Sequence, residues 1–276
     1  MAGQPDAAVS QVAENYVRAI YSHTEWQPEQ ITTSGLAARL GLAPSSVTEM
    51  VKKLSASGLV RHIPYGAVSL TDKGRTLALG MVRRHRLIET WLVALHGYSW
   101  DEVHDEAEVL EHALSDRLLE SIDRELGFPA RDPHGDPIPQ ADLTVPRVRA
   151  TLLGDATDGA EGVVVRISDR DPALLRHLAA SFIDVDTALK VVGRTPFGGD
   201  LQLAVGDTEV TIGLDAAAAI WISVDATTQP AASKSVEAER AQPERAEADR
   251  AAQTFPRSAS RRQQAASNRP DSLGTS

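Results

Sequence analysis

The chain has 276 residues, no cysteine and a formal net charge of −10. Its length allows two domains and a small third one. The lack of cysteine excludes disulfides and thiolate ligands, so a metal site would need His, Asp, Glu, Asn or backbone oxygen ligands. No apolar run reaches the roughly 18 residues of a membrane span, and the N-terminus lacks the regions of a secretory signal. We therefore expect a cytoplasmic protein without a membrane partner.

The negative charge is concentrated in the middle of the chain. Residues 1–75 carry 7 Lys and Arg against 6 Asp and Glu, whereas residues 76–150 carry 8 against 14. Residues 151–230 carry 5 against 12. A DNA-binding head on an acidic body would show this pattern, because attraction to phosphate needs only a local basic surface.

The first 75 residues have the element order of a winged helix-turn-helix. Apolar spacing, capping residues and glycine stops place these elements. The expected elements are helices over 8–23, 35–40 and 44–57, then extended segments over 59–63 and 67–70. We assign residues 1–75 to this DNA-binding domain.

The second helix of such a motif enters the major groove by its N-terminal end. Small hydroxyls there can meet bases or phosphates, and the helix N-terminus itself attracts phosphate. Glu49 could accept from a cytosine amino group. The predicted DNA-binding residues are Ala43, Pro44, Ser45, Ser46, Thr48, Glu49, Lys52, Lys53, Arg61 and Tyr65. The alternative is a winged helix used for protein contact.

The remaining sequence predicts an all-α domain, a linker, a small β-barrel and a disordered tail. The all-α domain is assigned to residues 76–143. Its long helix of about 25 residues begins at Asp72, a second helix covers 100–113 and a third ends near Leu126. Many short alternating segments around one helical turn then indicate a barrel. The expected boundaries are 144–160 for the linker, 161–226 for the barrel and 227–276 for the tail. The fold class is α+β.

Two of these helices carry faces that suit a divalent metal ion. On the 100–113 helix, three residues at i, i+3 and i+4 project from one side, with a histidine one turn earlier. The preceding long helix has a His–Glu pair at i, i+4. Carboxylates with imidazoles suit borderline-to-hard ions such as Mn²⁺ and Fe²⁺. The candidate ligands are Glu108, Glu111 and His112, with His104, His85 and Glu89. Solvated helix charges are the alternative for each residue taken singly.

Seven segments between about residues 10 and 140 follow one family pattern: AENYVRAIY (13–21), LAARLGLAPSSVTEMVKKL (36–54), GLV (58–60), LTDKGR (70–75), RRHRLIETWL (83–92), VHDEAEVLEHALSD (103–116) and HGDPIP (134–139). On these segments the chain resembles the diphtheria-toxin-repressor family of metal-dependent regulators. The resemblance implies metal binding, dimerisation through residues 76–143 and repression of metal-uptake or iron-handling genes. It also implies that the C-terminal barrel is SH3-like.

The resemblance implies two metal positions. The principal one would use Asn15 of the first helix with Glu108, Glu111 and His112, and the second would use His85, Glu89 and His104. Iron-tuned members often have cysteine where this chain has Glu108, so the resemblance points to Mn²⁺. Asn15 departs from both the methionine and the aspartate of the family, although its carbonyl oxygen is a hard ligand.

The resemblance also suggests roles outside these two sets. Asp171 of the barrel would add a ligand to the second site, where Leu174 cannot ligate and His177 is a substitute. Arg86 matches a position that holds an anion. The dimer surface would lie on the helices of 76–127, through Trp91, Leu92, Leu95 and Leu110.

The sequence therefore predicts a homodimeric, metal-dependent regulator that binds double-stranded operator DNA and acts as a repressor of metal-homeostasis genes. Mn²⁺ is the expected cofactor, Fe²⁺ the second candidate, and other divalent transition metals would bind in vitro. No Ser–His or Cys–His arrangement supports an enzyme. The alternatives are a winged-helix regulator that senses another signal, a metalloenzyme, and a protein-interaction scaffold.

Overall fold

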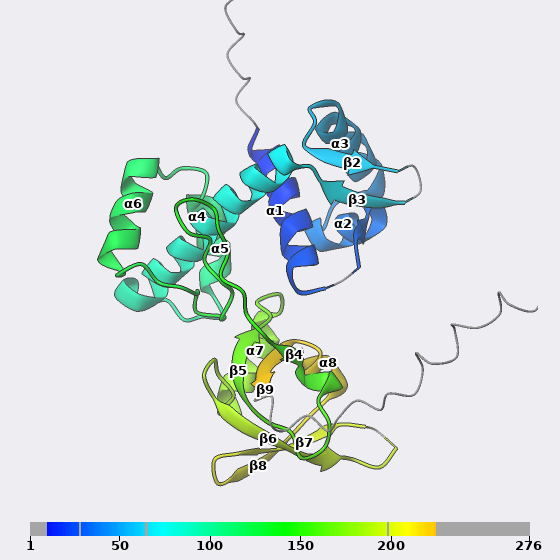
Figure 1. Cartoon of the computed structure of the whole chain (residues 1–276), viewed down its shortest axis with the longest axis vertical. Coiled ribbons are helices and arrows are strands. Elements are labelled where there is room, and N and C mark those ends of the chain that lie inside the picture. Colours follow the sequence, from blue (N-terminus) through cyan, green and yellow to red (C-terminus); the bar gives the residue numbers. More distant parts are fainter. Residues whose placement is uncertain (1–9, 28, 64–65, 198, 225–276) are drawn as a thin grey trace, which may run out of the picture. The chain divides into compact units, whose positions relative to one another are not determined.

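The computed structural model describes residues 10–27, 29–63, 66–197 and 199–224 (Figure 1). The predicted tail over 227–276 and the predicted DNA contact Tyr65 lie outside these residues. Within them, no helix combines the length and the apolar character that crossing a bilayer requires.

The N-terminal elements form the winged helix-turn-helix that the sequence predicts. They are α1 (Gln11–Trp26), β1 (Ile31–Thr32), α2 (Thr33–Leu40), α3 (Pro44–Ala56), β2 (Val60–His62) and β3 (Ala67–Leu70). The strands pair antiparallel in the order β1-β3-β2. Thr32 caps α2 by accepting the amide of Gly35, and Gly41 ends it with φ 63°. Pro44 opens α3, where its missing N–H costs nothing. The core is fully buried, with Val17, Leu36, Val47, Val51 and Val68 at its centre.

Three helices follow, α4 (Asp72–His96), α5 (Val103–Leu110) and α6 (Asp116–Glu125). α5 is shorter than the predicted helix over 100–113. Its C-cap residue Glu111 nevertheless keeps helical dihedrals, φ −58° and ψ −28°, and its amide still bonds the carbonyl of Ala107. The side chains after the end of α5 therefore stay in register with those on the helix.

The segment that follows α6 is packed into the protein. Asp132, His134, Asp136 and Ile138 are all buried. The carboxylate of Asp132 accepts the amides of His134 (2.9 Å) and Asp136 (3.0 Å), which closes a tight loop. Gly135 adopts φ +90°, and a Cβ there would lie 2.0 Å from a carbonyl oxygen of β5. Glycine is therefore what allows this loop to approach the strand so closely.

The C-terminal part is an antiparallel six-stranded sheet in the order β4-β9-β5-β6-β7-β8. Its elements are β4 (Thr151–Leu152), a 3₁₀ turn (Leu153–Asp155), β5 (Glu161–Ile167), α7 (Pro172–Ala180), β6 (Ala188–Arg194), β7 (Leu201–Val205), β8 (Thr208–Ile212), α8 (Leu214–Ala217) and β9 (Ile220–Val224). The predicted small barrel and the α+β class are confirmed. β4 begins inside the predicted linker over 144–160, because a two-residue strand has no alternating pattern to detect.

Gly74 on α4 provides a test of how the winged helix docks on the helical domain. A Cβ at Gly74 would lie 1.9 Å from the carbonyl oxygen of Leu59, whereas a Cβ at Gly80 on the same helix meets nothing within 4 Å. We expect Gly74→Ala to lower the free energy of unfolding by about 1–3 kcal/mol through overpacking. Gly80→Ala, the matched control, should raise it by about 0.5–1 kcal/mol. Chemical denaturation of both variants checks this, and equal effects would contradict the docking contact.

Candidate metal centre

α4 and α5 bring three predicted ligands together. His85 Nε2 lies 2.9 Å from Glu89 Oε1 and 3.1 Å from His104 Nδ1, and His104 Nδ1 lies 3.2 Å from the same Glu89 oxygen. One ligand atom of each residue falls within 4.8 Å of the others. His85 and Glu89 are buried and His104 is partly exposed. We call this set the His85 cluster, and its donors suit a divalent ion.

A second set of predicted ligands joins α1 to the end of α5. His112 Nε2 lies 2.7 Å from Asn15 Oδ1 and 3.4 Å from Glu111 Oε1, and His112 Nδ1 lies 2.8 Å from Glu14 Oε2. Glu111 is 1% exposed, and its Oε1 has no hydrogen-bond partner. Arg18 Nε lies within ion-pair range of this oxygen, at 3.4 Å. A buried carboxylate is costly unless a cation meets it, and a metal ion could serve in place of Arg18. We call these residues, Asn15, Glu111 and His112, the α1–α5 cluster and keep Glu108 as its predicted fourth ligand; the donors fit a hard divalent ion. Glu108 itself contacts Arg18 and, at 3.6 Å, His104.

A third set was not predicted and involves the loop after α6. Glu89, His134 and Asp169 each offer a ligand atom within 4.8 Å of the others. His134 Nε2 lies 2.7 Å from the carbonyl oxygen of Trp100, so this nitrogen must donate. In the neutral ring Nδ1 is then a lone-pair donor, and it is buried without a hydrogen-bond partner, 3.9 Å from Glu89 Oε2. Fixing one ring nitrogen to a carbonyl is how metal-binding histidines are oriented. We call this set the His134 cluster.

Burial and close charges shift several pKa values in these clusters. Burial lowers the pKa of His104, but hydrogen bonds to Glu108 and Glu89 and the charge of Asp169 outweigh it and raise this pKa to about 11. The hydrogen bond from His104, followed by the charge of Arg18, lowers the pKa of Glu108 to about 2. Burial, then the charge of Asp136, raises the pKa of Asp132 to about 8. At neutral pH His104 therefore holds a proton that a metal ion would have to displace, whereas the Glu108 carboxylate is already ionised.

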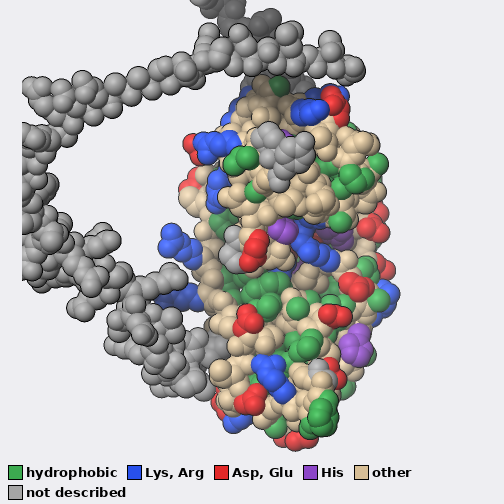
Figure 2. All heavy atoms as spheres, turned by 90° about the vertical axis from the view of Figure 1, so that its right-hand side faces the viewer, with side chains coloured by type: hydrophobic (Ala, Val, Ile, Leu, Met, Phe, Trp, Pro, Cys, Tyr) green, Lys and Arg blue, Asp and Glu red, His purple; other side chains and the backbone are tan. Residues whose placement is uncertain are grey.

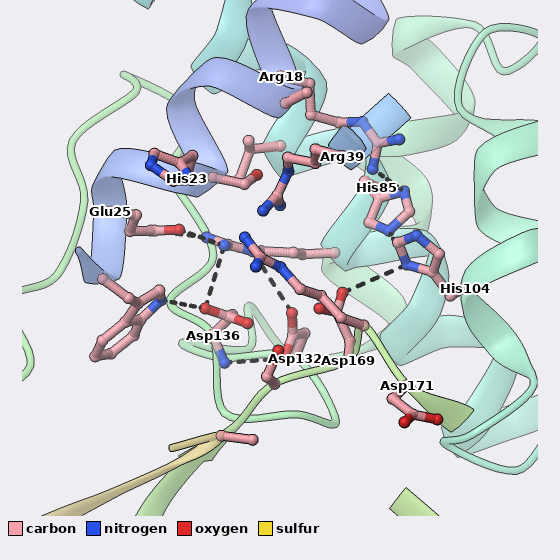
Figure 3. Close-up of a pocket in the computed structure, with 18 of the residues that line it drawn as sticks. Arg18, His23, Glu25, Arg39, His85, His104, Asp132, Asp136, Asp169 and Asp171 are labelled. Carbon is pink, nitrogen blue, oxygen red and sulfur yellow. Dashed lines mark hydrogen bonds and ion pairs between the residues drawn. The ribbon is translucent and has the colours of Figure 1, made fainter. Parts of the chain in front are cut away.

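The structure places Asp171 and Asp169 in different roles. The Asp171 carboxylate caps α7 by accepting the amides of Ala173 (2.9 Å) and Leu174 (3.3 Å), and it stands apart from the bonded network in Figure 3. Asp169 Oδ2 instead lies 3.4 Å from His104 Nδ1. Asp169 is therefore the barrel carboxylate that faces the His85 cluster, while a ligand role for Asp171 stays a prediction. The suggested substitute His177 is exposed on α7.

Arg86, the predicted anion-binding residue, is buried among carboxylates. Its guanidinium contacts Glu25 at 2.6 Å, Asp136 at 3.3 Å and Asp132 at 3.5 Å, and it donates to the carbonyl of Pro137 at 2.7 Å. These partners engage Nε and both terminal nitrogens, and the surrounding charge is negative. The geometry thus gives Arg86 internal partners, and its anion role stays a prediction.

Three family models match most of the described chain. The N-terminal DNA-binding domain model of the iron dependent repressors matches residues 8–68, and their metal binding and dimerisation domain model matches residues 71–140. A FeoA domain model matches residues 151–224. The iron-dependent repressor IdeR of Mycobacterium tuberculosis is 32% identical over 225 residues, covering 76% of this chain and 95% of that protein. The chain belongs to the iron-dependent repressor family.

Other repressors are also similar to this chain in sequence or structure. A solved manganese-dependent transcriptional repressor in complex with manganese is 50% identical, with a TM-score of 0.74, over 77% of this chain and 99% of that one. The diphtheria toxin repressor of Corynebacterium diphtheriae is 35% identical over 131 residues, covering 47% of this chain and 57% of that protein. The identification as a metal-dependent DNA-binding regulator with an SH3-like C-terminal barrel is confirmed.

The sequence did not predict His134 or Asp169 as candidate ligands. The signal was available only in part: the segment 134–139 resembles the family, but nothing in its spacing indicates that its histidine meets Glu89. The contact depends on the loop bonding to the barrel, where the amide of Ile167 donates to the carbonyl of His134 at 2.9 Å. This bond brings His134 and Asp169 to the same place.

The raised pKa of His104 predicts proton release on metal binding. Because this pKa is about 11 and a metal ligand must be unprotonated, His104 holds a proton at neutral pH that the ion displaces. The affinity for Mn²⁺ should therefore strengthen from about pH 6 to pH 8, roughly tenfold per pH unit for each proton released. Calorimetry in buffers of different ionisation enthalpy counts these protons. His104→Gln should remove one of them, and the exposed control His177→Gln should remove none. An affinity that does not change with pH would overturn this prediction.

Proposed function

We propose that this repressor senses Mn²⁺ through the α1–α5 and His85 clusters, with Fe²⁺ as the second candidate. The observation that carries the proposal is the meeting of Asn15 on α1 with Glu111 and His112 at the end of α5. Oxygen and imidazole donors without sulfur favour Mn²⁺ over softer ions. Bound there, the ion would supply positive charge shared by the DNA-binding head and the helical domain.

The clusters couple sensing to DNA binding because α1 belongs to the DNA-binding domain. Asn15 comes from α1, whereas Glu111 and His112 follow α5, so an ion held by all three would tie α1 to the end of α5. An ion that binds this arrangement better than others shifts the population toward it. In a dimer, the arrangement fixes the spacing of two recognition helices for half-sites about one helical turn apart.

The recognition helix is α3, and its N-terminal end is open to a partner. Ala43, Pro44, Ser45, Ser46 and Glu49 are exposed, as are Lys52, Lys53 and Arg61. The Thr48 hydroxyl donates to the carbonyl of Pro44 at 2.8 Å, so it stabilises the first turn and retains its lone pairs for a partner. On the face in Figure 2, acidic and basic side chains are interspersed with hydrophobic ones. Attraction to DNA would therefore be local to α3 and the wing, in keeping with the net charge of −10.

We also infer that the chain is not an enzyme. Its relatives are repressors by name, and the ligand side chains have the role of a sensor in the proposal above. The alternative is a winged-helix regulator that senses another signal and whose acidic and imidazole side chains are structural. Its affinity for DNA would not depend on metal.

The metal dependence is tested with a duplex selected from a random-sequence pool in the presence of Mn²⁺. We expect Mn²⁺ to raise the affinity for this duplex by about 5–150-fold over chelator, the usual range of coupling between two sites. The Glu108→Ala/His112→Ala variant should lose this response. Glu106→Ala, on the same helix but outside the cluster, should keep it. Equal affinity in Mn²⁺ and in chelator would exclude the proposal.

The placement of DNA on α3 is tested through salt dependence. Removal of two phosphate contacts in Lys52→Ala/Lys53→Ala should weaken binding to all sequences alike and lower the slope of log affinity against log salt by about 2. Lys190→Ala removes a barrel lysine that pairs with Glu161 and should leave the slope unchanged. Fluorescence anisotropy across a salt series measures both slopes, and an unchanged slope in the double variant would place DNA elsewhere.

A further inference from the structure

Arg18 lies among the candidate ligands without being one. It stands one turn after Asn15 on α1, and its side chain is 13% exposed. Its Nη2 donates to Glu108 Oε1, its Nη1 lies 3.2 Å from His85 Nδ1, and its Nε lies 3.4 Å from Glu111 Oε1. In Figure 3 its guanidinium points at the ring of His85. One cation therefore contacts members of both the α1–α5 cluster and the His85 cluster.

The charge of Arg18 is permanent, unlike those of its neighbours. A guanidinium does not lose its proton in proteins, whereas His85, His104 and the carboxylates can exchange theirs. Among the described residues, no other lysine or arginine is in ion-pair range of Glu108 or Glu111. Arg18 is thus the fixed positive charge that these two carboxylates share.

We propose that Arg18 is a built-in competitor of the metal ion: its guanidinium donates to Oε1 of Glu108, lies in ion-pair range of Oε1 of Glu111, and thereby sets the metal concentration to which the repressor responds. This inference rests on the ligand assignment proposed above. A divalent ion and a guanidinium repel each other and require the same carboxylate lone pairs. Arg18 therefore has two effects of opposite sign. It stabilises the metal-free protein and lowers the affinity for metal.

The opposite role would be positioning, in which Arg18 holds Glu108 and Glu111 in place for the ion. The two roles predict opposite changes when the charge is removed. Loss of a competitor strengthens metal binding, whereas loss of a positioning residue weakens it. The long flexible stem of Arg18 supports competition, because the guanidinium can swing away while Asn15 stays on the rigid helix.

The test is calorimetric titration of the full chain with Mn²⁺ at fixed pH, with thermal unfolding in chelator and in Mn²⁺. Arg18→Gln keeps a hydrogen-bonding side chain without charge and should bind Mn²⁺ about tenfold or more tightly, as expected for removal of a like charge in contact with the site. Arg18→Lys keeps the charge and should stay within about threefold of the wild type. Arg131→Gln, which removes an exposed ion pair with Asp186, should change nothing.

Thermal unfolding supplies a readout besides affinity. Arg18→Gln should lower the unfolding temperature in chelator, because Glu108 and Glu111 lose the positive charge that they share, and should increase the rise that Mn²⁺ produces. If the glutamine variant does not fold, Arg18→Met repeats the measurement with the aliphatic stem retained. Weaker or unchanged Mn²⁺ binding in the uncharged variants would overturn the role of Arg18. If the Glu111→Gln/His112→Ala variant instead binds Mn²⁺ as the wild type does, the ligand assignment itself is wrong.

Discussion

The buried carboxylate of Glu111 is the interaction on which the rest of the site depends. It is 1% exposed at the end of α5, yet it meets His85 from α4 at 2.7 Å, Arg18 from α1 at 3.4 Å and His112 beside it at 3.4 Å. A buried charge must be paired, and the nitrogens that meet it come from α1, from α4 and from the turn after α5. Of these elements, α1 belongs to the DNA-binding domain. If Glu111 is a metal ligand as proposed, the pairing of this one side chain connects sensing to DNA recognition.

Glu89 is a second buried carboxylate that must be paired, and its neighbours include Asp169 of the barrel. It is a member of both the His85 and His134 clusters, and burial of its carboxylate is offset by the charges and hydrogen bonds of the surrounding imidazoles, which hold its pKa well below the usual range. Further along the same network, Arg166 of β5 lies over the rings of Trp26 and Trp221 at 4.9 and 4.3 Å and pairs with Asp136 at 2.8 Å. α1 therefore contacts charged partners from both the helical domain and the barrel.

The sequence predicted the parts of the site that lie on helices, because helical periodicity states which side chains share a face. His85 with Glu89, and His104 with Glu108, follow from spacing alone. Asn15 required the family resemblance. Neither spacing nor the resemblance indicated that His134 and Asp169 lie together, since residues in a loop and after a strand follow no helical periodicity. Their meeting depends on Gly135 approaching β5. The family resemblance pointed to Asp171 and not to Asp169, because neither resemblance nor spacing reveals that the Asp171 carboxylate caps α7.

Everything proposed for this repressor requires that Asn15 on α1 share a metal ion with Glu111 and His112. The decisive measurement is anomalous diffraction at the manganese edge from crystals of the chain grown with Mn²⁺. We expect a peak within coordination distance of Asn15 Oδ1, the Glu111 carboxylate and the ring of His112. Peaks confined to the neighbourhood of Glu89, with Asn15 outside coordination distance, would contradict it.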